Sequence, residues 1–230
     1  FQELREDLKQ KGHIFHSKTD SEVLIYGYKE YGYDFVKQLR GMFAFAIWDK
    51  VNDTMFIARD GFGIKPLYYT TNTTDGSLLF GSEIKSFLAH PAFIKEVNKD
   101  ALRPYLTLQY SSMGETFFKG VHKLKPAHYM VLKGNDIHTV EYWDKKFHAE
   151  NGTLESYVEE VKATMADSVR AHKICDVKTG AFLSGGVDSS LVTALMKPEK
   201  SFSVGFSEYE KMFNETNQAA DLSDILGIEN

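Results

Sequence analysis

The sequence predicts two successive domains: an α+β domain with antiparallel sheets over residues 1–150, and an incomplete α/β domain with a parallel sheet over residues 151–230. Between residues 42 and 144, short apolar runs follow one another with turn residues between them, which is typical of antiparallel sheet. After residue 153, helix and strand patterns alternate, which favours a parallel sheet covered by helices. A polar stretch containing Asn151 and Gly152 separates the two patterns and is interpreted as the linker.

Composition limits the classes of function. The chain has 230 residues, 43% of them hydrophobic, which is enough apolar mass for a buried core. Its 27 basic and 32 acidic residues are mixed along the sequence, so we expect no nucleic-acid partner. No apolar run reaches about 18 residues and no signal peptide is visible, so we expect no membrane association and a cytoplasmic location. The single cysteine, Cys175, excludes an internal disulfide and is expected to be structural.

The first fifty residues predict two helices and a strand. Leu4 and Leu8 lie one helical turn apart, and Gly12 stands where that helix would end. Thr19 and Glu22 match a capping box at the start of a second helix. Its apolar positions have helical spacing: Leu24, Tyr28, Tyr31 and Phe35. Residues 42–49, MFAFAIWD, are apolar on both faces, which predicts a strand buried between two layers.

The rest of the first domain predicts further strands and two short helices. The strands are expected at residues 54–59, 66–70, 77–82, 128–134 and 136–144. Asp75 and Gly76 are a hairpin signal between the second and third of these. Residues 83–90 and 100–110 have helical patterns, and Pro104 either interrupts the second helix or lies in its first turn.

The second domain begins with a long helix that Thr153 caps. The apolar positions of this helix are Tyr157, Val161, Met165 and Val169. Beyond it we expect a strand at 179–183, a helix at 187–196, a strand at 201–206 and a helix at 214–227. This order is that of a βαβα unit.

The segment FLSGGVDSS, residues 182–190, lies between the first of these strands and its helix. Backbone N–H groups, the helix dipole and serine hydroxyls converge in such a turn, and anions bind there. Gly185 and Gly186 lack the side chains that would keep a phosphate away from the backbone. The segment is not a Walker A loop, because no Gly-Lys-Ser/Thr follows at the required spacing.

The whole string LSGGVDSS resembles the pyrophosphate-binding loop of the ATP pyrophosphatases. The resemblance implies that ATP is bound, that a substrate carboxylate attacks its α phosphorus, and that pyrophosphate leaves while Mg²⁺ is bound. It implies these ATP-binding residues: Leu183, Ser184, Gly185, Gly186, Asp188, Ser189, Ser190 and Val204. Asp188 would also hold Mg²⁺, although a first-turn carboxylate is favourable at a helix N-terminus in any case. From the residues alone, Leu183 and Val204 are core positions.

Four segments of the first domain resemble the class II glutamine amidotransferase domain of the glutamine-hydrolysing asparagine synthetases: TDSEV (19–23), GMFAFAIWD (41–49), ARDGFGIKPLYY (58–69) and FGSEIKSFL (80–88). The resemblance implies an N-terminal-nucleophile hydrolase fold, an αββα sandwich, followed by a Rossmann-like domain. Asp20 would bind the α-amino group of glutamine, or it simply favours the helix that follows Thr19. We expect Arg59, Asp60, Gly61 and Gly63 to shape the glutamine pocket. Gly61 replaces a larger, often basic residue of many relatives.

The two ends of the chain depart from that family. Its glutaminases begin with a catalytic cysteine, whereas this chain begins with Phe1, so we expect no catalytic residue and no glutaminase activity in the chain as written. The synthetase domain of the family continues beyond Asn230 with the residues that recognise aspartate, so we expect a fragment truncated at both ends. Glu215 either approaches the substrate or favours the N-terminus of its own helix.

The resemblance implies ATP-dependent synthesis of asparagine from aspartate, with glutamine or ammonia as the nitrogen donor and β-aspartyl-AMP as the intermediate. A homodimer is also expected from the family. Two alternatives remain open at this point. One is a related synthetase of the β-lactam-synthetase type with another acyl substrate, and the other is a non-catalytic nucleotide-binding scaffold. The two loop glycines disfavour the scaffold, because a loop without a ligand gains nothing from them.

Overall fold

The structure is a computed structural model and describes residues 1–111, 114–149, 151–175, 177–206 and 214–230. The chain divides into two compact units, Phe1–Phe147 and His148–Asn230. Residue 150, the last of the predicted first domain, lies outside the described residues. Within the described part of the chain, no helix has the length and apolar character needed to cross a membrane.

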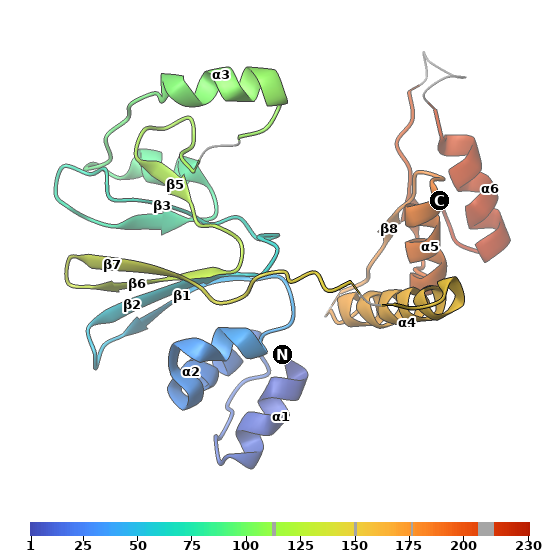
Figure 1. Cartoon of the computed structure of the whole chain (residues 1–230), viewed down its shortest axis with the longest axis horizontal. Helices are drawn as coiled ribbons and strands as arrows, with labels where there is room; N and C mark the ends of the chain where they lie inside the picture. The colour runs from blue at the N-terminus through green and yellow to red at the C-terminus, as the bar shows by residue number, and fades with distance from the viewer. Residues whose placement is uncertain (112–113, 150, 176, 207–213) are drawn as a thin grey trace. The chain divides into compact units, whose positions relative to one another are not determined.

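The first unit has two antiparallel sheets between layers of helix (Figure 1). The strand order is β1-β2-β6-β7 in one sheet and β4-β3-β5 in the other. The strands are β1 (Ala44–Asp49), β2 (Thr54–Arg59), β3 (Tyr68–Thr70), β4 (Leu79–Gly81), β5 (Val121–Lys123), β6 (His128–Lys133) and β7 (Asp136–Glu141). The helices are α1 (Gln2–Gln10), α2 (Asp20–Tyr31), the 3₁₀ helices η1 (Gly32–Gln38) and η2 (Ile84–Ala89), and α3 (Lys99–Leu108). Figure 1 shows the layers in the predicted order: helices, sheet, sheet, helices.

Strand β2 carries side chains into both layers of core. Phe56 and Ala58 are buried in a cluster with Phe35 and Val36 of η1. On the opposite face of β2, Ile57 packs in a second cluster with Met130 of the neighbouring strand β6 and with Leu67 and Leu124, which lie beside the ends of β3 and β5. Alternate residues of a strand point to opposite faces, and β2 has an apolar residue at each of these positions.

Strand β1, which the sequence places between two layers, packs Phe45 and Ile47 against the first cluster and Ala44 against the second, and it is an edge strand of its sheet. Its neighbour β2 takes the central position, and Trp48 of β1 is 47% exposed. The apolar pattern identified the strand and its two packed faces, whereas the pairing order, which makes β1 an edge strand, was not predicted.

Several local predictions were wrong in detail. Helix α2 ends at Tyr31, so Phe35 lies in η1. The capping box is absent, because Glu22 accepts hydrogen bonds from His16 and Ser17 instead of the Thr19 N–H. Residues 84–89 form a 3₁₀ helix, and Pro104 lies inside α3 without ending it. Strand β5 was not predicted.

The second unit contains α4 (Leu154–His172), β8 (Ala181–Phe182), α5 (Val187–Met196), β9 (Ser201–Phe202) and α6 (Thr216–Leu226). Strands β8 and β9 pair in parallel, with Ala181 opposite Ser201, and α5 connects them. The predicted order of elements is therefore observed. Thr153 caps α4, since its hydroxyl accepts the N–H of Ser156 at 3.2 Å. Of the four predicted apolar positions of α4, only Val169 is buried.

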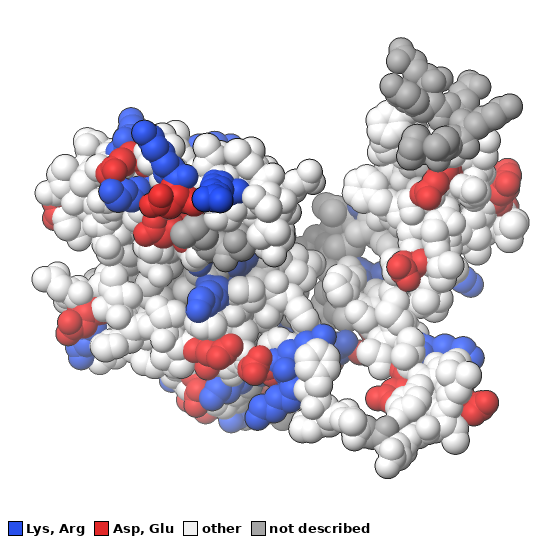
Figure 2. Space-filling model, turned by 45° about the horizontal axis from the view of Figure 1, so that its top comes forward, with Lys and Arg blue, Asp and Glu red and all other residues white. Residues whose placement is uncertain are grey.

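Charged residues of both signs are interspersed on the face of the first unit that Figure 2 shows. Most ion pairs among the described residues join exposed side chains, such as Lys9 with Glu6 and Lys162 with Glu159. Pairs of this kind contribute little to stability, about 0–1 kcal/mol each. Stability of the first unit is therefore assigned to its apolar clusters.

Candidate functional site

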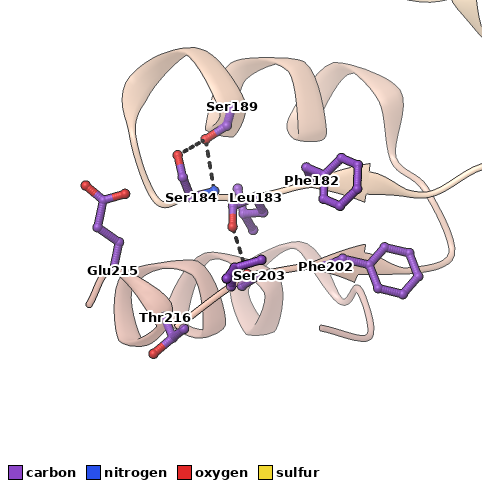
Figure 3. Close-up of a pocket in the computed structure, with 9 residues that line it drawn as sticks. Phe182, Leu183, Ser184, Ser189, Phe202, Ser203, Glu215 and Thr216 are labelled. Atoms are coloured by element: carbon purple, nitrogen blue, oxygen red, sulfur yellow. Dashed lines mark hydrogen bonds between the residues drawn. The ribbon is translucent and has the colours of Figure 1, made fainter. Parts of the chain in front are cut away.

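A cavity of about 300 Å³ lies at the carboxyl ends of the two parallel strands of the second unit (Figure 3). This edge of a parallel sheet is where α/β domains bind ligands. Three segments form its wall: the ends of β8 and β9, the loop before α5 and the start of α6. The lining residues are Phe182, Leu183, Ser184, Ser189, Phe202, Ser203, Val204, Glu215 and Thr216.

The loop serines bond to each other across the turn. The Oγ atoms of Ser184 and Ser189 are 3.0 Å apart, and the Ser189 hydroxyl donates to the Gly186 carbonyl at 3.1 Å. Figure 3 shows both hydroxyls on the same side of the loop, facing each other. Among the described residues, no side chain caps the N-terminus of α5. The first N–H groups of α5 therefore remain available for an anion.

The two loop glycines have different reasons to be glycine. Gly185 has φ of +79°, and a Cβ built on it would lie 2.8 Å from Cβ of Gln218 on α6. A Cβ on Gly186 would meet only Oγ of Ser184, at 3.5 Å. The role of both glycines in clearing space for a phosphate stays a prediction, and the structure gives Gly185 two further reasons to be glycine. Gly185 is required by its backbone conformation and by the approach of α6, and only Gly186 leaves open space.

Leu183 and Val204 differ in burial. Leu183 is 2% exposed, its N–H donates to the Phe202 carbonyl at 2.9 Å, and its carbonyl accepts the Ser203 hydroxyl at 2.8 Å. Val204 is 78% exposed. The expectation that both are core positions by sequence alone holds for Leu183 and is wrong for Val204. An exposed valine beside a cavity is a candidate contact for a ligand.

The predicted ATP-binding residues are divided between the cavity wall and the turn behind it. Four of them line the cavity: Leu183, Ser184, Ser189 and Val204. The other four, Gly185, Gly186, Asp188 and Ser190, belong to the loop and the first turn of α5. The Ser190 N–H donates to the Gly186 carbonyl at 3.0 Å and so begins the helix.

Asp188 is an exposed carboxylate in the first turn of α5. Among the described residues, no three His, Cys, Asp or Glu side chains gather where they could hold a metal ion. Mg²⁺ is usually held by one or two carboxylates together with substrate phosphates and water. A single carboxylate fits that donor set when phosphate oxygens supply the other ligands.

Three lining residues extend the sequence-based prediction. Glu215, for which two roles were open, lies at the N-cap position of α6 and also lines the cavity. Thr216 and Ser203 were not predicted. Thr216 donates its hydroxyl to Oδ1 of Asn214 at 2.8 Å. The polar end of the strand SFSVGF was the only signal for Ser203, and nothing in the sequence singled out Thr216.

In the first unit, Asp20 is the first residue of α2 and is exposed. Its carboxylate accepts a hydrogen bond from the Ser21 hydroxyl at 3.3 Å. A carboxylate in the first turn of a helix is stabilised by the helix dipole. Since the side chain remains exposed, both roles considered for it, ligand and helix stabiliser, are compatible with its position.

Asp60 organises the loop that follows β2. Its carboxylate is buried and accepts four backbone N–H groups at 2.9–3.3 Å: those of Phe43, Phe62, Ile64 and Lys65. Arg59, also buried, donates to the carbonyl groups of Gly63, Lys65 and Leu124. Desolvation by burial lowers the pKa of Arg59. The hydrogen-bonding groups of Arg59 and Asp60 are thus occupied by the loop backbone. This agrees with the expectation that the two residues shape a pocket and do not react.

Gly61 and Gly63 accommodate bulky neighbours in the same loop. A Cβ on Gly61 would lie 3.3 Å from the Trp143 ring, and the Phe62 and Trp143 ring centroids are 5.4 Å apart. Gly63 has φ of +64°, and a Cβ there would lie 2.8 Å from the Arg59 guanidinium carbon. Trp143 therefore occupies space beside Gly61, a contact that sequence analysis did not predict.

The single thiol lies in the second unit. Cys175 is exposed, and its Sγ donates to the Val177 carbonyl at 2.9 Å. The Cys175 side chain is thus at the surface and is not a core residue.

Comparison with known proteins follows the division into two units. The model of the glutamine amidotransferase domain family matches residues 1–143, and the asparagine synthase family model matches residues 160–230. Asparagine synthetase 1 (glutamine-hydrolysing) of Bacillus subtilis (strain 168) is 39% identical over 99% of this chain and 36% of its own length. Asparagine synthetase 3 of the same organism is 35% identical over 92% of this chain and 36% of its own length. The chain thus spans about a third of the length of these relatives.

Among solved structures, the glutamine phosphoribosylpyrophosphate amidotransferase of B. subtilis, complexed with ADP and GMP, aligns with 85% of this chain and 41% of its own at a TM-score of 0.44 and 14% identity. The sequence matches confirm the resemblance to the glutamine-hydrolysing asparagine synthetases. The chain belongs to the glutamine amidotransferase domain family, and its residues 160–230 match the asparagine synthase family model.

Proposed function

We propose that the complete protein makes asparagine from aspartate and ATP, with glutamine or ammonia as the nitrogen donor. The observation that carries this proposal is the presence of both family matches in one chain, with residues 1–143 in the amidotransferase family and residues 160–230 in the asparagine synthase family. The order assigns nitrogen release to the first domain, residues 1–150, and carboxylate activation to the second, which begins at residue 151.

In the second domain, the loop before α5 would hold the β and γ phosphates of ATP. The uncapped N–H groups of α5 and the open side of Gly186 support this role. Ser184, Ser189 and Ser190 would supply or orient hydroxyl groups, and Gly185 would keep the turn in its left-handed conformation. Leu183 and Val204 would border the nucleoside at the strand ends.

The reaction then has two balanced steps. An oxygen of the aspartate side-chain carboxylate attacks the α phosphorus, the bond from that phosphorus to the bridging oxygen breaks, and pyrophosphate leaves with the electron pair. Ammonia next attacks the β-aspartyl carbonyl, loses a proton, and displaces AMP. Asp188 would hold Mg²⁺, which neutralises charge on the departing pyrophosphate.

In the first domain, Asp20 would bind the α-ammonium group of glutamine. The exposed position of its carboxylate supports this. The loop that Arg59 and Asp60 hold, with Gly61 and Gly63, would shape the rest of the pocket. The αββα layers support assignment to the N-terminal-nucleophile hydrolase fold, and the parallel β8–α5–β9 unit supports a Rossmann-like second domain. We further propose that the protein is cytoplasmic and that it forms a homodimer. Light scattering of the purified protein would test the homodimer.

The test supplies the complete protein with Mg²⁺, ATP and aspartate, and provides ammonia in one reaction and glutamine in another. We expect asparagine, AMP and pyrophosphate in equal amounts from both nitrogen donors. Asp188→Asn should reduce aspartate-dependent pyrophosphate release, whereas Asp224→Asn, a change at an exposed carboxylate near the end of α6, should leave it unaltered. Product from ammonia alone would overturn the glutamine-binding part of the proposal. Absence of aspartate-dependent pyrophosphate would overturn the synthetase part.

A further inference from the structure

The carboxylate of Glu22, two residues beyond Asp20, is directed away from α2 toward the preceding loop. It accepts three hydrogen bonds: from the His16 N–H at 2.8 Å, the Ser17 N–H at 2.7 Å and the Ser17 hydroxyl at 2.6 Å. The Ser17 hydroxyl, followed by the His16 N–H, lowers the pKa of Glu22 to about 2. Glu22 is therefore ionised at neutral pH, and its acceptor positions are committed to the loop.

Ser17 is held through each of its polar groups. Its N–H and hydroxyl donate to Glu22, and its carbonyl accepts a hydrogen bond from the guanidinium group of Arg5 on α1. The same guanidinium lies over the Phe15 ring, 4.4 Å from the ring centroid. Helices α1 and α2 pack against each other through a buried cluster of Leu4, Leu8 and Val23 (Figure 1). The two side chains that bind Ser17, Arg5 and Glu22, therefore belong to helices that are packed together.

The hydrogen bonds of Ser17 extend to Thr19, the residue before Asp20. The Thr19 N–H donates to the Ser17 Oγ at 3.2 Å, and the Oγ atoms of Ser17 and Thr19 lie 2.8 Å apart. Thr19 is the N-cap residue of α2, and Asp20 follows it as the first helical residue. The backbone direction at Asp20 is thereby fixed from two sides, by the helix that starts there and by the Ser17–Thr19 contacts that Glu22 orders.

We infer that Glu22 is a positioning residue of the glutamine site, which orders the loop of residues 16–19 and so places the Asp20 carboxylate. The inference rests on the proposed function, in which Asp20 binds the α-ammonium group of glutamine. Glu22 does not touch glutamine in this assignment. It acts through Ser17 and Thr19, and the cost of losing it falls on binding of glutamine, not on the later chemistry at the second domain.

The experiment compares four single variants of the complete protein: Glu22→Gln, Ser17→Ala, Asp20→Asn and, as a matched control, Glu30→Gln. Glu30 lies on the same helix and also binds the preceding loop, since its carboxylate is 3.0 Å from Nε2 of His13. For each variant, kcat and KM are measured with glutamine and with ammonia, and the melting temperature is recorded.

We expect Glu22→Gln to raise the KM for glutamine about tenfold or more, because small displacements of a binding group have effects of up to about a hundredfold. Its ammonia-dependent kcat should stay within twofold of the parent value. Ser17→Ala should raise the same KM by a smaller factor. A double variant that combines Glu22→Gln with Ser17→Ala should have a KM no higher than that of Glu22→Gln, since both changes break one chain of contacts. Glu30→Gln should leave the KM unchanged.

The outcomes separate the inference from the function on which it rests. If Asp20→Asn leaves the KM for glutamine unchanged, the proposed role of Asp20 is wrong. If Asp20→Asn raises that KM and Glu22→Gln does not, the inference alone is overturned. A Glu22→Gln protein that loses glutamine-dependent and ammonia-dependent activity equally, with a lowered melting temperature, would show a purely structural role and would also overturn it.

Discussion

Alanine substitution at the two loop glycines should affect different properties: stability at Gly185 and ligand binding at Gly186. At Gly185, alanine must adopt φ of +79°, and its Cβ would lie 2.8 Å from Cβ of Gln218. The left-handed conformation costs about 1–2 kcal/mol for a residue with a Cβ. Overpacking against α6 adds about 1–3 kcal/mol. We therefore expect Gly185→Ala to lower the free energy of unfolding of the second unit by about 2–5 kcal/mol.

At Gly186, alanine is compatible with the backbone, since φ is −72° and ψ is 161°. Its Cβ would be at ordinary contact distance, 3.5 Å, from Oγ of Ser184. Alanine is a poorer N-cap than glycine, but it also restricts the unfolded chain, which offsets about 0.4–1 kcal/mol. We expect stability to change by less than about 0.5 kcal/mol. Affinity for MgATP should fall about ten- to a hundredfold, because the new methyl group displaces a phosphate from the N–H groups of α5.

The assay is urea unfolding of the complete protein and both variants, followed by calorimetric titration with MgATP. A Gly185→Ala protein with parental stability would refute the packing argument, because it would require that α6 move away without cost. A Gly186→Ala protein that binds MgATP as tightly as the parent would refute the assignment of phosphates to this turn. The pair is informative because each glycine serves as the control for the other.

Three further predictions concern single side chains. Asp60→Ala should destabilise the first unit by about 3–5 kcal/mol in urea unfolding, since four backbone N–H groups lose their acceptor; a change below 1 kcal/mol would contradict the scaffold role. Burial raises the pKa of Tyr142 from 10.0 to about 12, and its hydroxyl donates to the Arg59 carbonyl. The contribution of the neutral Tyr142 hydroxyl to the free energy of unfolding should be complete below pH 10 and lost as the pH rises toward 12. Tyr142→Phe should remove this contribution to the fall in melting temperature between pH 10 and pH 12. Thr153→Ala should lower the stability of the second unit by about 1 kcal/mol through loss of the α4 cap, whereas Thr164→Ala on the exposed face of the same helix should not, and equal effects would contradict the capping explanation.

Local pattern was sufficient for elements whose pattern is strong. The sequence placed β2 at residues 54–59 and α5 at residues 187–196, and the structure has the same bounds. Turn residues separate β2 from its neighbour, and the loop glycines precede α5, so each element has a local signal at its boundary. Strand β5 has three residues, VHK, without apolar alternation. It forms only because β3 offers a free edge.

The candidate site shows the same division. The string LSGGVDSS was enough to place a turn between strand and helix, and its role in anion binding stays a prediction. It was insufficient to distinguish Gly185 from Gly186, because the distinction depends on α6, which begins at Thr216. Glu22 matched a capping box by spacing, yet its carboxylate contacts His16 and Ser17. The N–H groups of the preceding loop compete with the N-cap N–H for the Glu22 carboxylate, and only the folded loop decides which of them it binds.

The sequence by itself determined the two-part organisation, the family, the order of helices and strands, and the position of the glycine-containing turn before α5. These properties depend on residues close together in the chain: periodic apolar positions, turn residues and a contiguous motif. Only the tertiary structure decided that β1 lies at an edge, that Trp143 packs beside Gly61, that Val204 is exposed and that α6 closes against Gly185. Each of these features is a contact, or the lack of one, between segments that are distant in sequence. The conformational preference of a segment does not specify which other segment packs against it, so such contacts are set only when the chain folds.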